Sequence, residues 1–101
     1  MAGDYDSLLR DYTEASFAIL PDGSVVKGLG PLRGFFQQVI PEFTHPSTVF
    51  NLNQHVVEGE MAYISWSAET PKNVFELGSD TFHISDGKIR AQTLACKVTP
   101  K

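Results

Sequence analysis

Asp80 is the residue whose type and position most strongly suggest chemistry. The segment 77–85, LGSDTFHIS, alternates as a β-strand does, and Asp80 falls on the same face as Phe82 and Ile84. A carboxylate on an apolar face is costly unless it is hydrogen-bonded, paired or protonated. Asp80 is therefore either a structural group satisfied by a backbone N–H, a tyrosine or Gln92, or the general acid, base or hydrogen-bond donor of a pocket.

The three histidines are weaker candidates. His55 shares the alternating face of a strand with Asn51 and Asn53, and this polar row is either a solvated face or the mouth of a pocket. His83 falls on the strand face opposite the aspartate, so we expect it to point outward or to lie at a dimer interface. His45 lies in a proline-flanked loop. No pair of them has metal-ligand spacing, and we expect neither a metal site nor a cofactor.

The single cysteine, Cys96, leaves no partner for an internal disulfide. A catalytic cysteine needs a nearby base and a lowered pKa, and the sequence shows no such base. A small strand residue that faces the core is the better interpretation of Cys96. The chain also has no nucleophile elbow, glycine-rich phosphate loop or dinucleotide fingerprint, so any proton transfer depends on Asp80.

Composition and charge limit the classes of function. The chain has 101 residues, the length of one domain, with a formal net charge of −4 and only eight Lys and Arg residues. Nucleic acid and anionic membranes both require a basic patch, so neither is an expected partner. No apolar run approaches the roughly 20 residues of a membrane span, and the acidic N-terminus has no signal-peptide core. We therefore expect a soluble, cytoplasmic protein.

The hydrophobic pattern predicts helices first and a run of antiparallel strands after them. This order is typical of an α+β fold with helices on one face of a curved sheet. Helices are expected over 4–14, capped by Asp4 or Asp6, and over 28–43. The turn 21–23 joins two short strands into a hairpin. The expected strands cover 15–20, 24–27, 48–58, 60–70, 74–85 and 88–98.

The turn 86–87 allows two registers for the last hairpin, and the residues beside Asp80 depend on which register forms. A two-residue type I′ loop pairs Ser85 with Lys88. The side chains on the face of Asp80 are then Ile89, Ala91, Thr93 and Ala95. A three-residue loop pairs Ile84 with Lys88 instead. The side chains on the face of Asp80 are then Gln92, Leu94 and Cys96. Periodicity alone favours neither register.

Three segments together resemble the nuclear-transport-factor-like superfamily, which includes SnoaL-like polyketide cyclases and ketosteroid isomerases. Segment 3–23, GDYDSLLRDYTEASFAILPDG, is similar to the family's second helix and the strand after it. Segment 25–36, VVKGLGPLRGFF, resembles the third-helix pattern G-x-x-x-(I/L)-x-x-F-(F/Y). Segment 78–89, GSDTFHISDGKI, is similar to the penultimate strand and its turn. The likeness covers nearly the whole chain and rests on the order and spacing of the segments.

The resemblance implies a cone-shaped, curved antiparallel sheet with helices packed on its concave side, often in a homodimer packed through the sheet. It also implies the three-residue turn. Asp80 then stands where ketosteroid isomerases hold a protonated aspartic acid that donates to an oxyanion. The wall of the implied pocket consists of Tyr12, Phe17, Ile19, Phe36, His55, Trp66, Phe82, Gln92, Leu94 and Cys96.

Two positions depart from the isomerase pattern. The general base of the isomerases would fall near Ile19, whose side chain can neither accept nor donate a proton. The partner tyrosine of the isomerases comes from a first helix, and this chain begins at what resembles the second. Steroid isomerisation is therefore not expected. We expect 1–101 to be a single SnoaL-like domain without the usual first helix, which leaves one wall of the cone for a second copy to cover.

Two classes of function are compatible with these residues and with the resemblance. The first is a pocket for a small apolar ligand whose polar group meets Asp80. If such a protein is an enzyme, it uses general acid–base catalysis without a cofactor, in a reaction such as isomerisation, cyclisation, dehydration or epoxide opening. The second is a non-catalytic module for ligand binding, dimerisation or protein interaction. A deep pocket distinguishes the first class from the exposed apolar patch of an interaction module.

Overall fold

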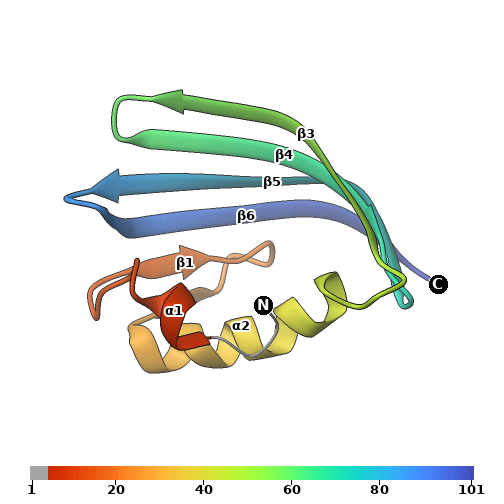
Figure 1. Ribbon diagram of the computed structural model, residues 1–101, viewed down its shortest axis with the longest axis horizontal. Helices are drawn as coiled ribbons and strands as arrows, with labels where there is room; N and C mark the ends of the chain where they lie inside the picture. Colours follow the sequence, from red (N-terminus) through yellow and green to blue (C-terminus); the bar gives the residue numbers. More distant parts are fainter. Residues whose placement is uncertain (1–4) are drawn as a thin grey trace.

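The computed structural model describes residues 5–101, which form two helices and six strands (Figure 1). The predicted α+β class is confirmed. The first helix ends at Leu9 rather than at 14, and Asp4, one of its candidate caps, lies outside the described residues. The elements are α1 (Tyr5–Leu9), β1 (Phe17–Ile19), β2 (Val25–Lys27), α2 (Leu29–Phe43), β3 (Val49–Glu58), β4 (Met61–Glu69), β5 (Asn73–Ser85) and β6 (Lys88–Pro100).

The first helix is short because the chain after it bonds to β6 instead. The backbone N–H of Ile89 donates to the carbonyl of Asp11 at 2.6 Å, and the hydroxyl of Ser16 donates to the carbonyl of Ile89 at 2.6 Å. Ser16 is fully buried, so its bond to Ile89 is largely shielded from water. The two bonds hold the segment after α1 against the sheet and bring Tyr12 into the core.

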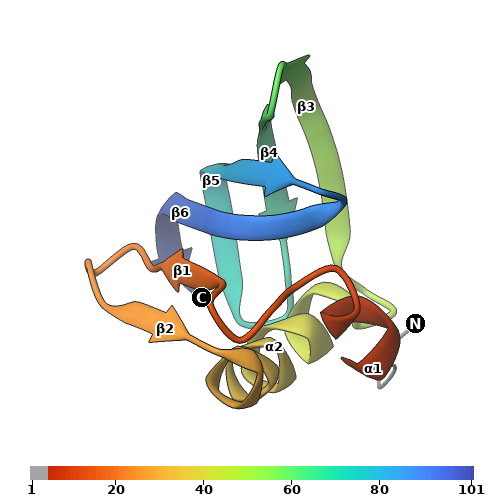
Figure 2. The same ribbon diagram turned by 90° about the vertical axis from the view of Figure 1, so that its left-hand side faces the viewer.

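The six strands form one sheet in the order β2-β1-β6-β5-β4-β3, which curves over α2 (Figures 1 and 2). β1 and β2 form the predicted antiparallel hairpin. The sheet is mixed rather than wholly antiparallel, because β1 runs parallel to β6 with Ala18 opposite Gln92. The helices lie on the concave side, as predicted, and Leu32 and Phe36 of α2 form the buried core together with Tyr12 and Ala18.

The predicted neighbours of Asp80 arise through a different turn from the one the resemblance implied. The turn 86–87 is a two-residue type I′ loop, since both residues have positive φ (54° and 73°) and Ser85 pairs with Lys88. A bulge follows, where the register shifts next to His83. Beyond the bulge, the residues opposite Gly78, Asp80 and Phe82 are Cys96, Leu94 and Gln92. The bulge supplies the extra residue that a three-residue loop would have supplied.

A second bulge breaks the predicted polar row on β3. On β4, Asn51 pairs with Ser67 and His55 pairs with Ile64, because the register shifts between them. The two partners are three positions apart, so their side chains lie on opposite faces of the sheet. Asn51 therefore lies on the convex face and His55 on the concave face, and the prediction that they share a face is wrong.

Close packing on the concave face requires a glycine at position 78. Gly78 pairs with Trp66, and a Cβ at Gly78 would overlap the carbons of the indole ring. Trp66 is 8% exposed, and its Nε1 donates to Oδ1 of Asp80 at 3.0 Å. The missing side chain at position 78 thus sets the position of the indole that bonds to Asp80.

We expect Gly78→Ala to lower the free energy of unfolding by about 1–3 kcal/mol, the usual effect of overpacking, because the methyl group displaces the indole. Urea denaturation measures the change, and the emission of Trp66, the one tryptophan of the chain, reports the displacement. Gly34→Ala in α2 is the control, since a Cβ there meets nothing within 4 Å and favours the helix. Wild-type stability and emission for Gly78→Ala would contradict this packing.

Candidate functional site

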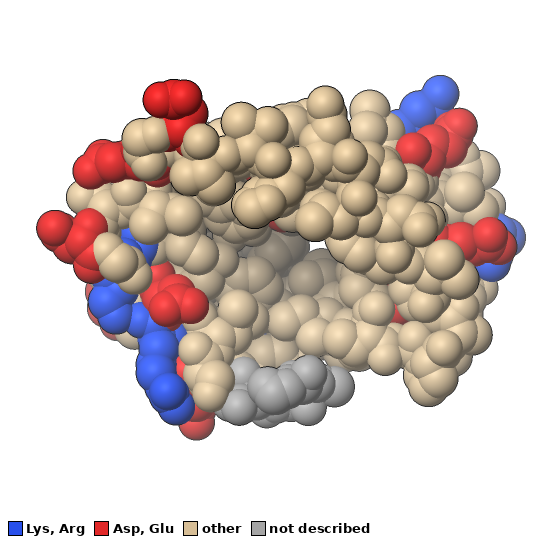
Figure 3. Space-filling model, turned by 45° about the horizontal axis from the view of Figure 1, so that its top comes forward, with Lys and Arg blue, Asp and Glu red and all other residues tan. Residues whose placement is uncertain are grey.

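A cavity of about 370 Å³ lies between the concave face of the sheet and α2. Small-molecule sites typically have volumes of about 300–1,000 Å³. Figure 3 shows the molecule hollowed at its middle, with charged side chains gathered mainly toward the two ends of the view. The wall is mostly apolar. Its residues are Pro21, Phe35, Phe36, Val39, Ile40, Glu42, Phe43, Thr44, Phe50, Ile64, Trp66, Phe75, Asp80, Gln92, Leu94, Ala95 and Cys96.

Asp80 belongs to a chain of four hydrogen-bonded side chains, three of them in this wall and one behind it. Its Oδ1 accepts from Nε1 of Trp66 at 3.0 Å, and its Oδ2 accepts from Nε2 of Gln92 at 3.3 Å. Oε1 of Gln92 in turn accepts from the hydroxyl of Tyr12 at 2.6 Å. Asp80 is therefore satisfied by side chains, and the bond to Tyr12 fixes which way the Gln92 amide faces.

Burial raises the pKa of Asp80 and outweighs the hydrogen bonds from Trp66 and Gln92, which act in the opposite direction. Burial is also the main reason why the pKa values of Tyr12 and Cys96 are raised, and the charge of Asp80 adds to both shifts. The Tyr12 hydroxyl and the Cys96 thiol therefore stay protonated near neutral pH. Cys96 is not an activated nucleophile, and Asp80 is the better placed group for proton exchange.

The structure brings together six residues of the predicted site. The predicted residues that line the cavity are Phe36, Trp66, Asp80, Gln92, Leu94 and Cys96. Tyr12 stands behind the wall, bonded to Gln92 and with its ring centroid 5.6 Å from that of Phe36. Phe82 and His55 lie on the concave face but are not part of the cavity wall. That these residues contact a ligand stays a prediction.

The predicted positions of Phe17 and Ile19 in the pocket wall are wrong. β1 pairs with β6 so that Ala18 lies opposite Gln92 on the concave face, and Ala18 is fully buried. Phe17 and Ile19 therefore point to the convex face, away from the cavity. Alternation shows which residues of a strand share a face, but in three residues it does not show which face is buried.

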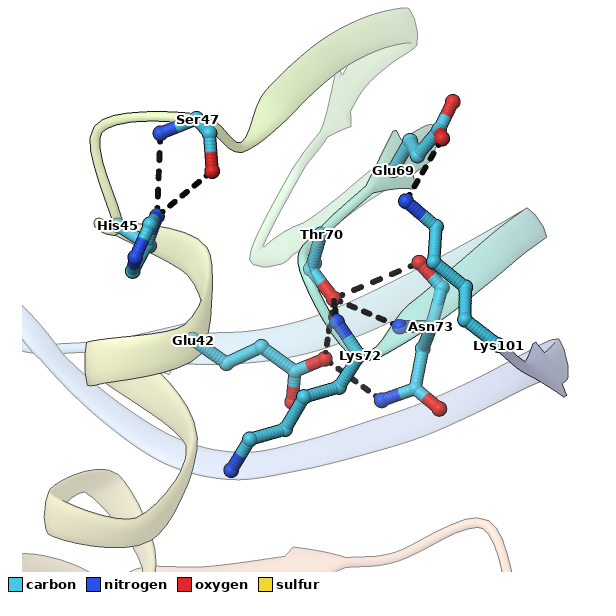
Figure 4. Close-up of polar contacts among 8 residues, drawn as sticks. All are labelled: Glu42, His45, Ser47, Glu69, Thr70, Lys72, Asn73 and Lys101. Carbon is cyan, nitrogen blue, oxygen red and sulfur yellow. Dashed lines mark hydrogen bonds and ion pairs between the residues drawn. The ribbon is translucent and has the colours of Figure 1, made fainter.

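Glu42, near the end of α2, lines the cavity and was not among the predicted site residues. Its Oε2 accepts from the hydroxyl of Thr70 at 2.6 Å and from Nδ2 of Asn73 at 2.7 Å (Figure 4). These bonds anchor the end of α2 to the turn between β4 and β5. A signal for Glu42 was present in the sequence. It follows Val39 at helical spacing, so it is a carboxyl on an apolar stripe, as Asp80 is on a strand.

Four aromatic rings in the cavity wall contact one another. The ring centroid of Phe43 lies 6.4, 5.4 and 5.1 Å from those of Phe50, Trp66 and Phe75. Trp66 also stacks on Phe50, with centroids 5.5 Å apart and an interplanar angle of 27°. We call these four residues the aromatic cluster. They come from α2, β3, β4 and β5, which no local sequence pattern brings together.

The remaining histidines lie away from the cavity. Nε2 of His83 contacts Oε1 of Glu60 at 3.0 Å in an exposed position, and His45 bonds to Ser47 in the loop after α2 (Figure 4). Within residues 5–101, no group of three His, Cys, Asp or Glu side chains is arranged to hold a metal ion. None of the helices in this part of the chain has the length and apolar character needed to span a membrane.

No protein-family model matches the chain, and no curated protein matches its sequence. Several solved structures match its fold. A candidate SnoaL-like polyketide cyclase from Jannaschia sp. CCS1 is 14% identical with a TM-score of 0.74, and the match covers 96% of this chain and 74% of that one. A candidate ketosteroid isomerase from Kribbella flavida DSM 17836 is 15% identical with a TM-score of 0.74, covering 92% of this chain and 65% of that one. An NTF2-like protein of unknown function from Mesorhizobium loti is 23% identical with a TM-score of 0.75, covering 93% and 78%.

These matches establish the fold. The chain has the curved α+β fold of the SnoaL-like, ketosteroid isomerase-like and NTF2-like proteins, as the resemblance in its sequence predicted. At identities below 25% the likeness assigns no activity, because one fold carries many functions. Function has to be inferred from the cavity itself.

Asp80→Asn tests the burial of the carboxyl. Because the pKa of Asp80 is higher in the folded chain than in the unfolded one, its contribution to stability is greatest at low pH and is lost as pH rises through the folded pKa. We expect Asp80→Asn to raise the free energy of unfolding near neutral pH. The gain should shrink below the pKa of an unfolded aspartate, about 3.9. Urea denaturation at a series of pH values measures it.

Asp22→Asn is the matched control for this experiment. Asp22 is exposed, and hydrogen bonds from the hydroxyl and backbone N–H of Ser24 lower its pKa. Its contribution to stability is present above the unfolded pKa and is lost as pH falls, so the stability difference should vary with pH in the opposite sense. The same pH dependence in both variants would exclude burial as the dominant influence on Asp80.

Proposed function

We propose that this chain binds a small, largely apolar molecule in the cavity and holds a polar group of that molecule at Asp80 and Gln92. The observation that carries the proposal is a hydrogen-bonded carboxyl in the mostly apolar wall of a cavity of about 370 Å³. Concave apolar sites with a few convergent polar groups are the usual form of a small-molecule site.

Asp80 is preorganised to accept a hydrogen bond from such a ligand. The Trp66 indole and the Gln92 amide each occupy one position on its carboxyl oxygens, which retain further lone pairs. A ligand hydroxyl that donates to this carboxyl gains a charge-assisted bond beside a partly buried group. The apolar body of the ligand then covers the aliphatic and aromatic side chains of the wall.

Acid–base chemistry is the activity that two carboxyl groups in one cavity would support. The raised pKa of Asp80 moves its proton exchange closer to neutral pH than that of an ordinary aspartate. Glu42 supplies a second carboxyl in the same wall, at a place unrelated to Ile19. Isomerisation, cyclisation, dehydration and epoxide opening are reaction classes that such a pair catalyses without a cofactor.

We also propose that two copies of the chain associate through the convex face of the sheet. The strand registers place Val56, Tyr63, Thr81 and Thr93 in one row across β3 to β6, and none of these side chains is charged. Val56 and the neighbouring Met61 are 52% and 46% exposed. Exposed apolar groups in and beside an uncharged row across the sheet favour a protein interface, and a second copy packed sheet to sheet would cover them.

A matched pair of probes tests ligand binding. 4-tert-Butylphenol joins an apolar body to one hydroxyl, and tert-butylbenzene lacks the hydroxyl. We expect the phenol to bind the wild type more tightly than the hydrocarbon. We expect Asp80→Asn to weaken phenol binding about fivefold, because a neutral acceptor replaces a charged one. Calorimetry measures the affinities, and the emission of Trp66 reports occupancy of the cavity.

Leu94→Phe and Thr93→Phe control for the location of binding. Leu94 lines the cavity, whereas Thr93 points to the opposite face, so only Leu94→Phe should weaken binding. If neither probe binds the wild type, the binding proposal is wrong. If both bind equally and Asp80→Asn changes neither affinity, the role assigned to Asp80 is wrong.

Light scattering tests the association of two copies. We expect a dimer for the wild type and a monomer for Tyr63→Glu, because a charge buried in the interface without a partner opposes association. Val25→Glu is the control, since Val25 is 60% exposed on β2, at the far edge of the sheet from β3. This variant should remain dimeric. A monomeric wild type would contradict the proposed dimer and leave the ligand proposal unaffected.

A further inference from the structure

We infer that the ligand of this cavity is an organic cation, an apolar molecule that carries an ammonium group. The inference rests on the proposed function and names the class of its ligand. Its basis is the charge of the wall. Two carboxyl groups, those of Glu42 and Asp80, line the cavity, and no Lys, Arg or His is among the described residues that line it.

Within residues 5–101, the two carboxyl groups have neutral hydrogen-bond donors and no counter-ion. Asp80 accepts from Trp66 and Gln92, and Glu42 accepts from Thr70 and Asn73. The ion pairs found within residues 5–101 all join side chains outside the cavity wall. The cavity therefore offers negative potential to whatever enters it, and low-dielectric walls strengthen that potential.

Glu42 has one carboxyl oxygen to offer to a ligand. Its Oε2 accepts from both Thr70 and Asn73, which fixes the plane of the carboxyl group (Figure 4). Its Oε1 accepts no hydrogen bond from the part of the chain that the structure describes. Glu42 is thus oriented by neighbouring side chains and still able to meet a positive group.

The aromatic cluster adds a second attraction for positive charge. Phe43 follows Glu42 in the chain, and its ring contacts the rings of Phe50, Trp66 and Phe75, all in the cavity wall. The faces of aromatic rings attract a cation within about 6 Å of the ring centroid, and quaternary ammonium groups are typically bound by aromatic side chains. The ammonium group is expected beside these rings, near Glu42.

The apolar character of the rest of the wall decides which kind of cation fits. A small inorganic ion needs several oxygen ligands to replace its water, and this wall supplies few beyond its two carboxyl groups. An alkylated ammonium group is weakly hydrated and covers its charge with carbon. Its attached apolar body then contacts the aliphatic side chains of the wall, such as Val39 and Leu94.

An isosteric pair of probes tests this inference. (4-Hydroxyphenyl)trimethylammonium has the shape of 4-tert-butylphenol, with a positively charged nitrogen in place of one carbon. We expect calorimetry to show that the wild type binds the cation about tenfold more tightly than the phenol. We expect Glu42→Gln to reduce that preference, because one of the two carboxyl groups that attract the cation loses its charge. The glutamine oxygen can still accept from Thr70 and Asn73, so the end of α2 stays anchored.

Glu58→Gln is the matched control, because it makes the same change in net charge at an exposed position at the end of β3. It should leave the preference for the cation intact. Equal affinities of the wild type for the two isosteres would overturn the cation inference and leave the proposed function standing. Equal loss of the preference in both glutamate variants would show a general effect of net charge and would also overturn it. Failure of both probes to bind would overturn the proposed function itself.

Discussion

Partial burial of Asp80 takes a carboxyl group partly out of water, and the hydrogen bonds that satisfy it place the side chains around it. The indole of Trp66 lies where it can donate to Asp80, and only a glycine at position 78 leaves room for it there. The amide of Gln92 faces Asp80 because its oxygen is held by the hydroxyl of Tyr12. The raised pKa of Asp80 shows that these bonds only partly offset desolvation. One polar group thus determines positions on β4, β5, β6 and the segment after α1.

The elements of the fold were predictable from the sequence because each has a local cause. Helical spacing predicted α2, alternation predicted the long strands, and the turn 86–87 predicted the last hairpin. The bulges next to His83 and Asn53 were not predictable, since a bulge depends on how two strands fit together in the curved sheet. The first bulge restored the neighbours that the wrong turn type had implied for Asp80. The second bulge separated Asn51 from His55.

The candidate site was predictable only where one residue contradicts its own local pattern. Asp80 on an apolar strand face is such a contradiction, but strand pairing left two registers open, and only the resemblance favoured Gln92, Leu94 and Cys96 as its neighbours. Glu42 on the apolar stripe of α2 is an equal contradiction that was overlooked. The aromatic cluster carries no such signal, because a phenylalanine in a core and one in a cavity wall look alike in sequence. Ala18, rather than Phe17 or Ile19, faces inward because β1 pairs with β6, a contact across most of the chain.

Two departures from a well-packed core coincide in this fold. A cavity of about 370 Å³ leaves its lining side chains without partners on one side, which forfeits dispersion energy. A carboxyl with a raised pKa stands in the same wall and opposes folding near neutral pH. Larger side chains at positions such as Leu94 or Cys96 would fill the space. An apolar residue in place of Asp80 would remove the cost of burying a carboxyl group. Conflicts of this kind are expected at functional sites. A ligand that filled the volume and bonded to the carboxyl would offset both costs and stabilise the folded chain by mass action, which is the physical ground for proposing a binding site here rather than a packing defect.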